Sequence, residues 1–284
     1  MILKFLLYSF FTIIGISCQT HENRVAFNLR TTIDYWRFVV SILVRGDLIK
    51  VEYEWEFHCG GVIITSTYAL TTGWCIKKLI DEEIPIHDMI VRGNTETWNC
   101  SCGRKRDHTI QGFVMHENFK ESASPFSPTV YTNDIGIISV IDEFNGLYEV
   151  PSSYRMGTMF WTSQKLESVV VGWGYESKTA KGISDRLHYG TVKLYDRQEC
   201  ESRFRGVLPP HVYCIMLHQT PNVCTYESGG LHTGFINQYN ILIGLISSGI
   251  RCDSVLPTLI TNISEFTNWV KGRMKENDNM WPIR

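Results

Sequence analysis

A serine and an aspartate lie in short patterns that could support nucleophilic chemistry. Ser228 lies in Cys224-Thr-Tyr-Glu-Ser-Gly-Gly230, a Gly-flanked turn, and Asp134 lies in Thr132-Asn-Asp-Ile-Gly-Ile137. A serine hydroxyl is a poor nucleophile unless a neighbouring base takes its proton during the attack. The question is therefore which residue of this chain supplies that base.

The elements that must position these residues are short β-strands. Runs rich in β-branched and aromatic residues recur along the chain, and turn residues separate them at spacings typical of all-β barrels or sandwiches. Residues 142–158 are interpreted as a linker between two β units. Near the C-terminus, apolar residues recur at roughly helical spacing, which predicts one helix. These residues are Ile263, Phe266, Val270 and Met274.

Further patterns complete the set. Cys59-Gly-Gly-Val62 leads through a β run to Thr71-Thr-Gly-Trp-Cys75, and Gly172-Trp-Gly174 opens the second half. Together with the Asp134 and Ser228 patterns, and with Ile246-Ser-Ser-Gly249 and Cys252, they resemble the chymotrypsin-like (S1) serine proteases. The resemblance covers nearly the whole chain after residue 18.

The resemblance implies an all-β fold with two six-stranded antiparallel β-barrels (trypsin-like) and a C-terminal α-helix, with the active site in the cleft between the barrels. On this basis we expect a peptidase S1-like domain over 25–276. Its parts are a first barrel at about 25–145, a second barrel at about 155–262 and the helix at about 263–276.

The N-terminus predicts secretion. Lys4 precedes an apolar stretch over 5–16, and small residues follow, which indicates a signal peptide over 1–18. The stretch is too short to span a bilayer, and no later segment comes near eighteen uninterrupted apolar residues. We therefore expect a secreted, extracellular protein without a membrane anchor.

Cysteine usage fits that compartment. The chain has 9 cysteines, and loss of Cys18 with the signal peptide leaves an even number suited to disulfides. The family pattern would pair Cys59 with Cys75, Cys200 with Cys214, and Cys224 with Cys252. Cys100 and Cys102 have no family counterpart, so pairing with each other, free thiols and a bond to another chain all stay open. Two thiols without nearby histidines do not favour a metal site.

The resemblance breaks at the base. Family chemistry requires a histidine, an orienting carboxylate and a serine. Asp134 falls on the carboxylate position and Ser228 on the nucleophile position, but the residue before Cys75 is Trp74. An indole N–H is a hydrogen-bond donor only, so Trp74 cannot accept the serine proton. His58 and His232 flank family motifs, and family geometry gives neither the base position.

The activation and oxyanion regions also depart from the family pattern. Tyr226 replaces the glycine whose backbone N–H, with that of Ser228, belongs to the oxyanion region. Glu227 replaces the aspartate that pairs with the new N-terminus in the family. The activation-like cleavage falls between Arg24 and Val25, but the two glycines that normally follow are absent, so insertion of the new terminus is in doubt.

The expected substrate pocket is altered in the same way. Its floor falls on Asn222, which is neither acidic nor small and apolar. Thr258 replaces a glycine that lines the pocket, and Ser248 replaces a tryptophan between Ser247 and Gly249. By family analogy Ser247 can also donate a hydrogen bond to Asp134.

Charge and short motifs limit the possible partners. A formal net charge of −2 argues against nucleic acid. The dense basic run 104–106 is interpreted as a solvated loop, with polyanion binding as the minor reading. Asn99 and Asn262 lie in Asn-x-Ser sequons and are glycosylation candidates. We expect no metal and no cofactor.

These observations predict a secreted serine-protease homologue that is catalytically inactive and binds extracellular proteins, such as proteases or their substrates, as a regulatory module. Two alternatives stay open. One is an active serine endopeptidase with an unusual base, and the other is a binder of small ligands or glycans in the remodelled cleft.

Overall fold

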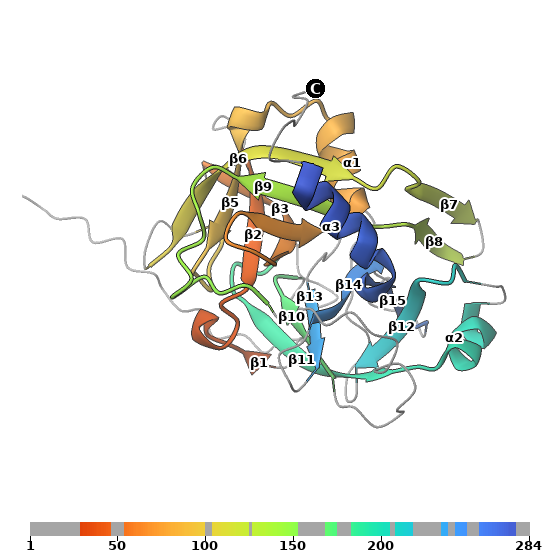
Figure 1. Cartoon of the computed structure of the whole chain (residues 1–284). Coiled ribbons are helices and arrows are strands. Elements are labelled where there is room, and N and C mark those ends of the chain that lie inside the picture. The colour runs from red at the N-terminus through yellow and green to blue at the C-terminus, as the bar shows by residue number, and fades with distance from the viewer. Residues whose placement is uncertain are drawn as a thin grey trace, which may run out of the picture.

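The computed structural model describes most of two β-barrel halves, drawn in Figure 1. The described residues are 29–46, 54–99, 104–124, 127–152, 168–174, 183–204, 208–217, 234–237, 242–248 and 256–276. The expected signal peptide, Arg24, Val25 and the Ser228 turn lie outside these ranges.

The first half is a closed six-stranded antiparallel barrel in the order β2-β3-β4-β9-β6-β5. Its alternating β-branched residues fill the interior, so that Ile42, Ile63 and Ile138 have no exposed surface. A two-stranded hairpin of β7 and β8 extends from it (Figure 1). The strands are β2 (Val39–Arg45), β3 (Trp55–Ile63), β4 (Tyr68–Thr71), β5 (Met89–Gly93), β6 (Arg106–Met115), β7 (Lys120–Ser124), β8 (Ser127–Thr132) and β9 (Gly136–Val140).

The second half also curls into a ring. Antiparallel pairing runs from β11 through β10, β13, β14, β15 and β12, and β12 pairs again with β11. β1 adds to the side of β11. The fold prediction of two barrels with a C-terminal helix is confirmed. These strands are β1 (Leu29–Arg30), β10 (Ser168–Gly172), β11 (His188–Leu194), β12 (Val212–Leu217), β13 (Gly234–Asn237), β14 (Leu242–Ser248) and β15 (Thr258–Asn262).

Helices are few and short. The C-terminal helix α3 continues from a 3-10 turn, η4, whose Phe266 is buried at the junction of the barrels. Trp269 donates its indole N–H to Glu117 at 2.9 Å, and Arg273 pairs with the same carboxylate, which fixes α3 to the first barrel. The helices are η1 (Ile33–Tyr35), α1 (Gly73–Asp81), η2 (Ile86–Asp88), α2 (Arg197–Phe204), η4 (Ile263–Phe266) and α3 (Thr267–Glu276).

The two halves share one apolar junction. Trp98 donates its indole N–H to the carbonyl of Ser184 at 2.8 Å, and Trp173 donates to the carbonyl of Glu96 at 2.9 Å. Phe57 lies between the two indoles, 5.9 Å from each ring centroid. Aromatic rings with satisfied indole nitrogens thus join the two halves.

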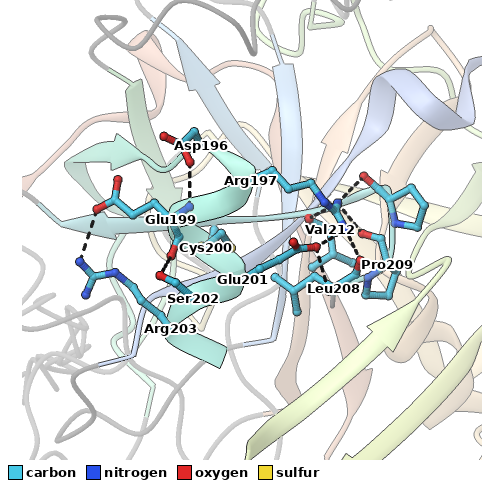
Figure 2. The surroundings of a disulfide bond; sticks show 12 residues. Asp196, Arg197, Glu199, Cys200, Glu201, Ser202, Arg203, Leu208, Pro209 and Val212 are labelled. Carbon is cyan, nitrogen blue, oxygen red and sulfur yellow. Dashed lines mark hydrogen bonds and ion pairs between the residues drawn. A yellow bond between two sulfur atoms is a disulfide. The ribbon is translucent and has the colours of Figure 1, made fainter. Parts of the chain in front are cut away.

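Two of the expected disulfides are present. Cys59 bonds Cys75, with 6.3 Å between the Cα atoms, and joins β3 to α1. Cys200 bonds Cys214, with 5.9 Å between the Cα atoms, and joins α2 to β12 (Figure 2). Arg197 holds the same loop through the carbonyl of Pro209 at 2.9 Å. Cys100, Cys102, Cys224 and Cys252 lie outside the described residues.

Candidate active site

Asp134 lies at the N-terminus of helix α1. The hydroxyl of Thr72 caps the helix by accepting from the amide of Cys75 at 3.2 Å. The backbone amide of Trp74 donates to Asp134 Oδ1 at 2.8 Å, and the backbone of Gly73 also bonds the carboxyl group. A helix N-terminus presents unpaired N–H groups and a partial positive charge, so it suits a carboxylate.

A glycine permits this close approach. A Cβ at Gly73 would lie 2.8 Å from the ring of Phe119 and 3.3 Å from the backbone nitrogen of Ile135. Any side chain here would push α1 away from the segment that carries Asp134. Gly73 is therefore a site residue that sequence reasoning missed. The only signal was its place in the motif before Trp74.

The second half supplies the remaining donor. Ser247, on β14, donates its hydroxyl to Asp134 Oδ2 at 2.6 Å, and both side chains are buried. The structure thus brings together Asp134 and Ser247, which lie 113 residues apart in the chain. Ser248 follows on β14 opposite Leu259, and the buried Thr258 begins β15 opposite Ile215.

Trp74 occupies the second residue of α1 and is half-buried. Its side chain packs against the buried residues of the first barrel, and the ammonium of Lys78 lies 5.5 Å from its ring centroid. The bond to Asp134 uses the backbone nitrogen, so it does not depend on the side chain at position 74. The backbone bonds that hold Asp134 are therefore compatible with an indole at position 74.

The environment of Asp134 changes its acidity. Burial raises the pKa of Asp134 to about 7, although the Ser247 hydroxyl and the backbone amides of Trp74 and Gly73 act to lower it. All three partners are neutral, and neutral donors only partly offset the loss of hydration of a buried carboxylate. Within the described part of the chain, Asp134 is thus a buried acid with three neutral donors and no cationic partner.

The turn that presents Asp134 has its own support. Asn133 has a φ of 53°, a left-handed conformation that asparagine tolerates better than most residues. Its amide donates to His211 Nε2 at 2.7 Å, and its side chain donates to the carbonyl of Asn118 at 2.7 Å. Sequence reasoning singled out neither Asn133 nor His211. Nothing in the sequence indicates that His211, 78 residues away, meets this turn.

His58 contacts the same helix from β3. It is buried, and its Nε2 lies 2.9 Å from the carbonyl oxygen of Cys75. A carbonyl only accepts, so this nitrogen carries the proton. Burial is the main reason that the pKa of His58 lies below its ordinary value. His58 therefore supports α1 as a neutral imidazole, and its Nε2 is already committed as a donor.

Several expected site residues lie outside the described ranges. They include the nucleophile position, the oxyanion region, the pocket floor and the activation-like segment. Their roles stay predictions. The residues concerned are Ser228, Tyr226, Glu227, Asn222, Gly249, Arg24 and Val25.

The two glycosylation candidates differ sharply in accessibility. Asn262 is 1% exposed, and its Oδ1 caps η4 by accepting from the amide of Ser264 at 3.1 Å. A glycan on its buried Nδ2 would have no space, so the structure corrects this expectation. Asn99 is half-buried in the segment after β5 and remains the candidate.

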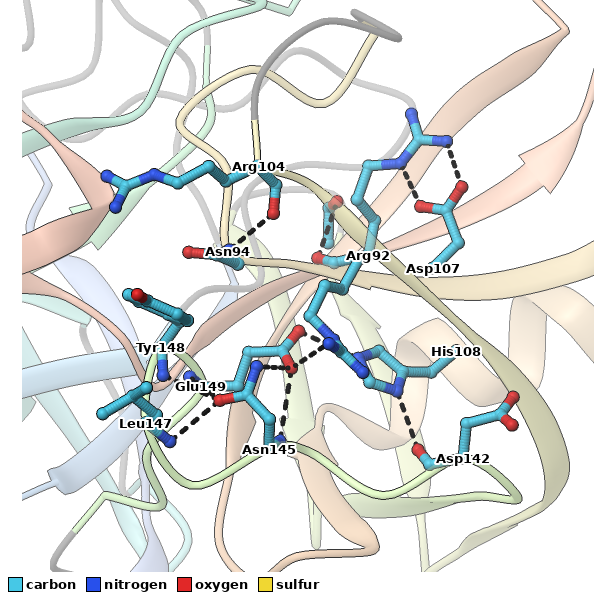
Figure 3. A network of polar contacts seen from close by, with 12 residues as sticks. Arg92, Asn94, Arg104, Asp107, His108, Asp142, Asn145, Leu147, Tyr148 and Glu149 are labelled. Carbon is cyan, nitrogen blue, oxygen red and sulfur yellow. Dashed lines mark hydrogen bonds and ion pairs between the residues drawn. The ribbon is translucent and has the colours of Figure 1, made fainter.

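A second buried polar cluster lies on the first barrel (Figure 3). Glu149 has no exposed side-chain surface. Its carboxylate oxygens lie 2.8 Å from His108 Nε2, 3.2 Å from Arg106 Nε and 3.1 Å from Asn145 Nδ2. His108 Nδ1 lies 2.7 Å from the carbonyl oxygen of Asp142. No motif in the sequence indicated this histidine–carboxylate pair.

The basic run 104–106 takes part in ion pairs. Arg104 meets Asp34 at 3.2 Å, Lys105 meets Asp107 at 2.7 Å, and Arg106 meets Glu149. Asp107 is also held by Arg92, at 2.6 Å (Figure 3). Each of the three basic side chains thus has a carboxylate partner, which argues against the minor reading of polyanion binding.

The described residues contain no group of three or more His, Cys, Asp or Glu side chains that could hold a metal ion. Within the same part of the chain, no helix has the length and apolar character needed to cross a bilayer.

Comparison with known proteins agrees with this geometry. The sequence model of the family described as Trypsin matches residues 28–270. The chain belongs to the trypsin family of serine proteases, with the two-barrel fold described above.

Curated relatives are distant and longer. Tissue-type plasminogen activator of Rattus norvegicus is 25% identical over 78% of this chain and 40% of its own length. Vitamin K-dependent protein C of Oryctolagus cuniculus is 24% identical over 82% of this chain and 51% of its own. Serine protease Hayan of Drosophila melanogaster is 23% identical over 76% of this chain and 34% of its own length. The chain thus spans about half or less of the length of these relatives.

A solved structure shows the same fold. Neuropsin, a serine protease expressed in the limbic system of mouse brain, superposes with a TM-score of 0.62. The match covers 84% of this chain and 94% of neuropsin at 18% sequence identity. At that identity the likeness shows the fold alone.

Proposed function

We propose that this chain is a secreted, non-catalytic serine-protease homologue that acts as a binding or regulatory module in extracellular proteolysis. One observation carries the proposal. Asp134 accepts hydrogen bonds from the Ser247 hydroxyl at 2.6 Å and from the backbone amide of Trp74 at 2.8 Å, while the side chain at the expected base position is an indole.

The chemical consequence is large. In the family mechanism the imidazole accepts the serine proton and later returns it to the leaving amine. An indole N–H has no lone pair for either step. Loss of the base in such a unit costs on the order of 10⁶ in rate. Among the described residues, His58 supports the same helix, but its Nε2 is committed to the carbonyl of Cys75.

Further departures would act independently of Trp74. Tyr226 replaces an oxyanion glycine, and loss of one oxyanion donor costs about 10²–10³ in rate. Thr258 is buried and β-branched, and it stands where the family has a pocket glycine, so we expect it to narrow the pocket. We therefore expect extracellular proteins, such as proteases or their substrates, to be the partners, with binding through the surface rather than through catalysis.

The test is a turnover assay of the purified mature protein against a broad peptide library. Trp74→His is measured beside the wild type, and Trp74→Phe is the matched control that changes the ring without adding a base. We expect no turnover from the wild type or from Trp74→Phe. We also expect no recovery in Trp74→His, because Tyr226 and the pocket stay altered.

Wild-type turnover that disappears in Ser228→Ala would overturn the proposal and favour the active endopeptidase with an unusual base. Recovery in Trp74→His alone would show that Trp74 is the only block. Saturable binding of small sugars to an inactive wild type, abolished by Trp74→Ala, would favour the alternative of a glycan binder.

A further inference from the structure

Two histidines flank the junction between the Asp134 turn and the C-terminal helix. His211 precedes β12 in the second half, and its ring centroid lies 5.1 Å from that of Phe266. His116 directly follows β6 in the first barrel, and its ring centroid lies 5.4 Å from that of Phe266 and 4.9 Å from that of Trp269. The two imidazoles therefore contact one aromatic side chain from different barrels.

Both imidazoles accept hydrogen bonds from backbone amides. The amide of Asn133 donates to His211 Nε2 at 2.7 Å, and the amide of Asn118 donates to His116 Nδ1 at 3.1 Å. The side chain of Asn133 closes the network by donating to the carbonyl of Asn118 at 2.7 Å. A backbone N–H cannot accept, so each of these ring nitrogens must be unprotonated.

The hydrogen bond to His211 holds a backbone amide in the left-handed conformation. Asn133 has a φ of 53° and directly precedes Asp134. His211 is 9% exposed, and its backbone carbonyl accepts from the amide of Asn262 at 2.8 Å, so its backbone is held in the second half. The contact from Asn133 to His211 thus ties the turn that carries Asp134 to the opposite barrel.

We propose that His211 is an acid-sensitive latch between the barrels: protonation of its Nε2 removes the acceptor for the Asn133 amide and releases the Asp134 turn. The added proton comes from solvent, and the resulting imidazolium presents N–H to N–H. His116, on the other side of Phe266, responds in the same direction because its Nδ1 also accepts from an amide.

The charges around the pair favour the neutral form. Burial is the main cause that lowers the pKa of His211, and His116 and Arg197 lower it further. Burial also lowers the pKa of His116, with help from Arg273. Glu117 lies 3.8 Å from His116 Nδ1, but the same carboxylate already holds Arg273 and the indole of Trp269. Asp134, next to Asn133, is bonded to Ser247 and to the helix α1.

The direction of the pH effect follows from linkage. Because the pKa of His211 is lower in the folded state, the unfolded chain binds more protons once the pH falls below about 6.5. The contribution of His211 to the free energy of unfolding is therefore complete above that pH. It is lost as the pH falls through the lowered pKa of the folded state. Asp134 titrates with the opposite sign, since its raised pKa favours the folded state in acid, so the latch must be measured as a difference between variants.

The experiment compares wild type with His211→Gln by chemical denaturation at pH 7 and pH 5. Glutamine offers an oxygen to the Asn133 amide and does not titrate. His87→Gln is the matched control, because His87 is an exposed histidine whose side chain is 79% accessible. For each protein we compare the drop in the folding equilibrium constant between pH 7 and pH 5. We expect this drop to be about tenfold larger in wild type and in His87→Gln than in His211→Gln. Equal losses in all three proteins would overturn the proposal.

A second measurement keeps the proposal testable if His211→Gln does not fold. Hydrogen exchange of the Asn133 amide in wild type, corrected for the intrinsic effect of pH, is compared with that of amides in β9. We expect protection of Asn133 to drop about tenfold at pH 5 while β9 stays protected. Unchanged protection of Asn133 would overturn the latch.

Discussion

Asp134 and Glu149 are both carboxylates with no exposed surface, yet their surroundings differ. Asp134 receives the Ser247 hydroxyl and two backbone amides, all neutral. Glu149 receives an imidazole at 2.8 Å and a guanidinium at 3.2 Å. A buried histidine–carboxylate pair is therefore present at Glu149, whereas the described contacts of Asp134 are all neutral.

The difference shows what each pairing does to acidity. Burial alone would lower the pKa of His108, but the hydrogen bond and the charge of Glu149 outweigh it and raise that pKa. Among the described residues Asp134 has no such partner, and burial raises its pKa to about 7. A buried carboxylate with a cation stabilises the charged pair, whereas one with neutral donors tends to take up a proton.

The largest expected effect comes from breaking the complete pair. Glu149→Ala leaves His108 and Arg106 without their carboxylate, and removing one partner of a buried ion pair costs about 3–5 kcal/mol. We expect a loss of this size in the free energy of unfolding, measured by urea denaturation. Glu149→Gln is the control that keeps the shape, and it should lose less.

The pH dependence sharpens this prediction. The pKa of His108 is raised above its ordinary 6.5, so the contribution of the pair is complete below that pH and fades as the pH rises through the raised value. The cost of Glu149→Ala should therefore be greater at pH 6 than at pH 9. A cost below about 1 kcal/mol at pH 6 would place the pair among weak surface contacts instead.

Removing the charge of Asp134 should change the free energy of unfolding in the opposite direction. Asp134→Asn removes a charge whose ionisation the fold disfavours, and the amide oxygen still accepts from the Trp74 backbone. A shift of each pKa unit corresponds to about 1.4 kcal/mol, and we expect a gain of about 1–3 kcal/mol at pH 8 after the weaker hydrogen bonds are counted.

That gain should disappear in acid. With a folded-state pKa of about 7, Asp134 keeps its proton in the folded protein, and the penalty for ionisation is absent below about pH 4. Denaturation of Asp134→Asn and wild type at pH 4 and pH 8 checks this. A destabilised variant at pH 8 would show that Asp134 is held as a favourable carboxylate, contrary to the comparison.

The smallest expected effect concerns the helix end that cradles Asp134. Thr72→Ala removes the cap that accepts from the Cys75 amide at 3.2 Å. Loss of such a cap costs about 0.5–2 kcal/mol, while Thr72→Ser, the matched control, should stay near wild type. Thermal unfolding of the three proteins tests this, and an equal loss in Thr72→Ser would assign the effect to the methyl group instead of the cap.

Sequence reasoning predicted the scaffold, two of its disulfides and the Asp134–Ser247 contact, and the structure confirms these. The Asp134 motif, Trp74 before Cys75, and two of the cysteine pairs each lie in patterns that the family repeats at known spacings. The Asp134–Ser247 bond came from that resemblance, since no local rule links residues 113 positions apart.

The remaining contacts depend on tertiary packing. Glu149 meets His108 across 41 residues, and His211 meets Asn133 across 78, with no spacing rule that would connect them. The sequence at Asn262 matches the Asn-x-Ser sequon, but the Asn262 side chain caps η4 and is buried. A short motif specifies chemistry that is possible, whereas burial decides whether it is accessible.

The proposed function requires that Asp134 no longer serves a catalytic base. The most direct measurement is labelling of the mature wild-type protein with a fluorophosphonate probe, with Ser228→Ala as the matched control. The account predicts the same background labelling in both proteins at pH 8. Stoichiometric labelling of the wild type that is lost in Ser228→Ala would contradict it.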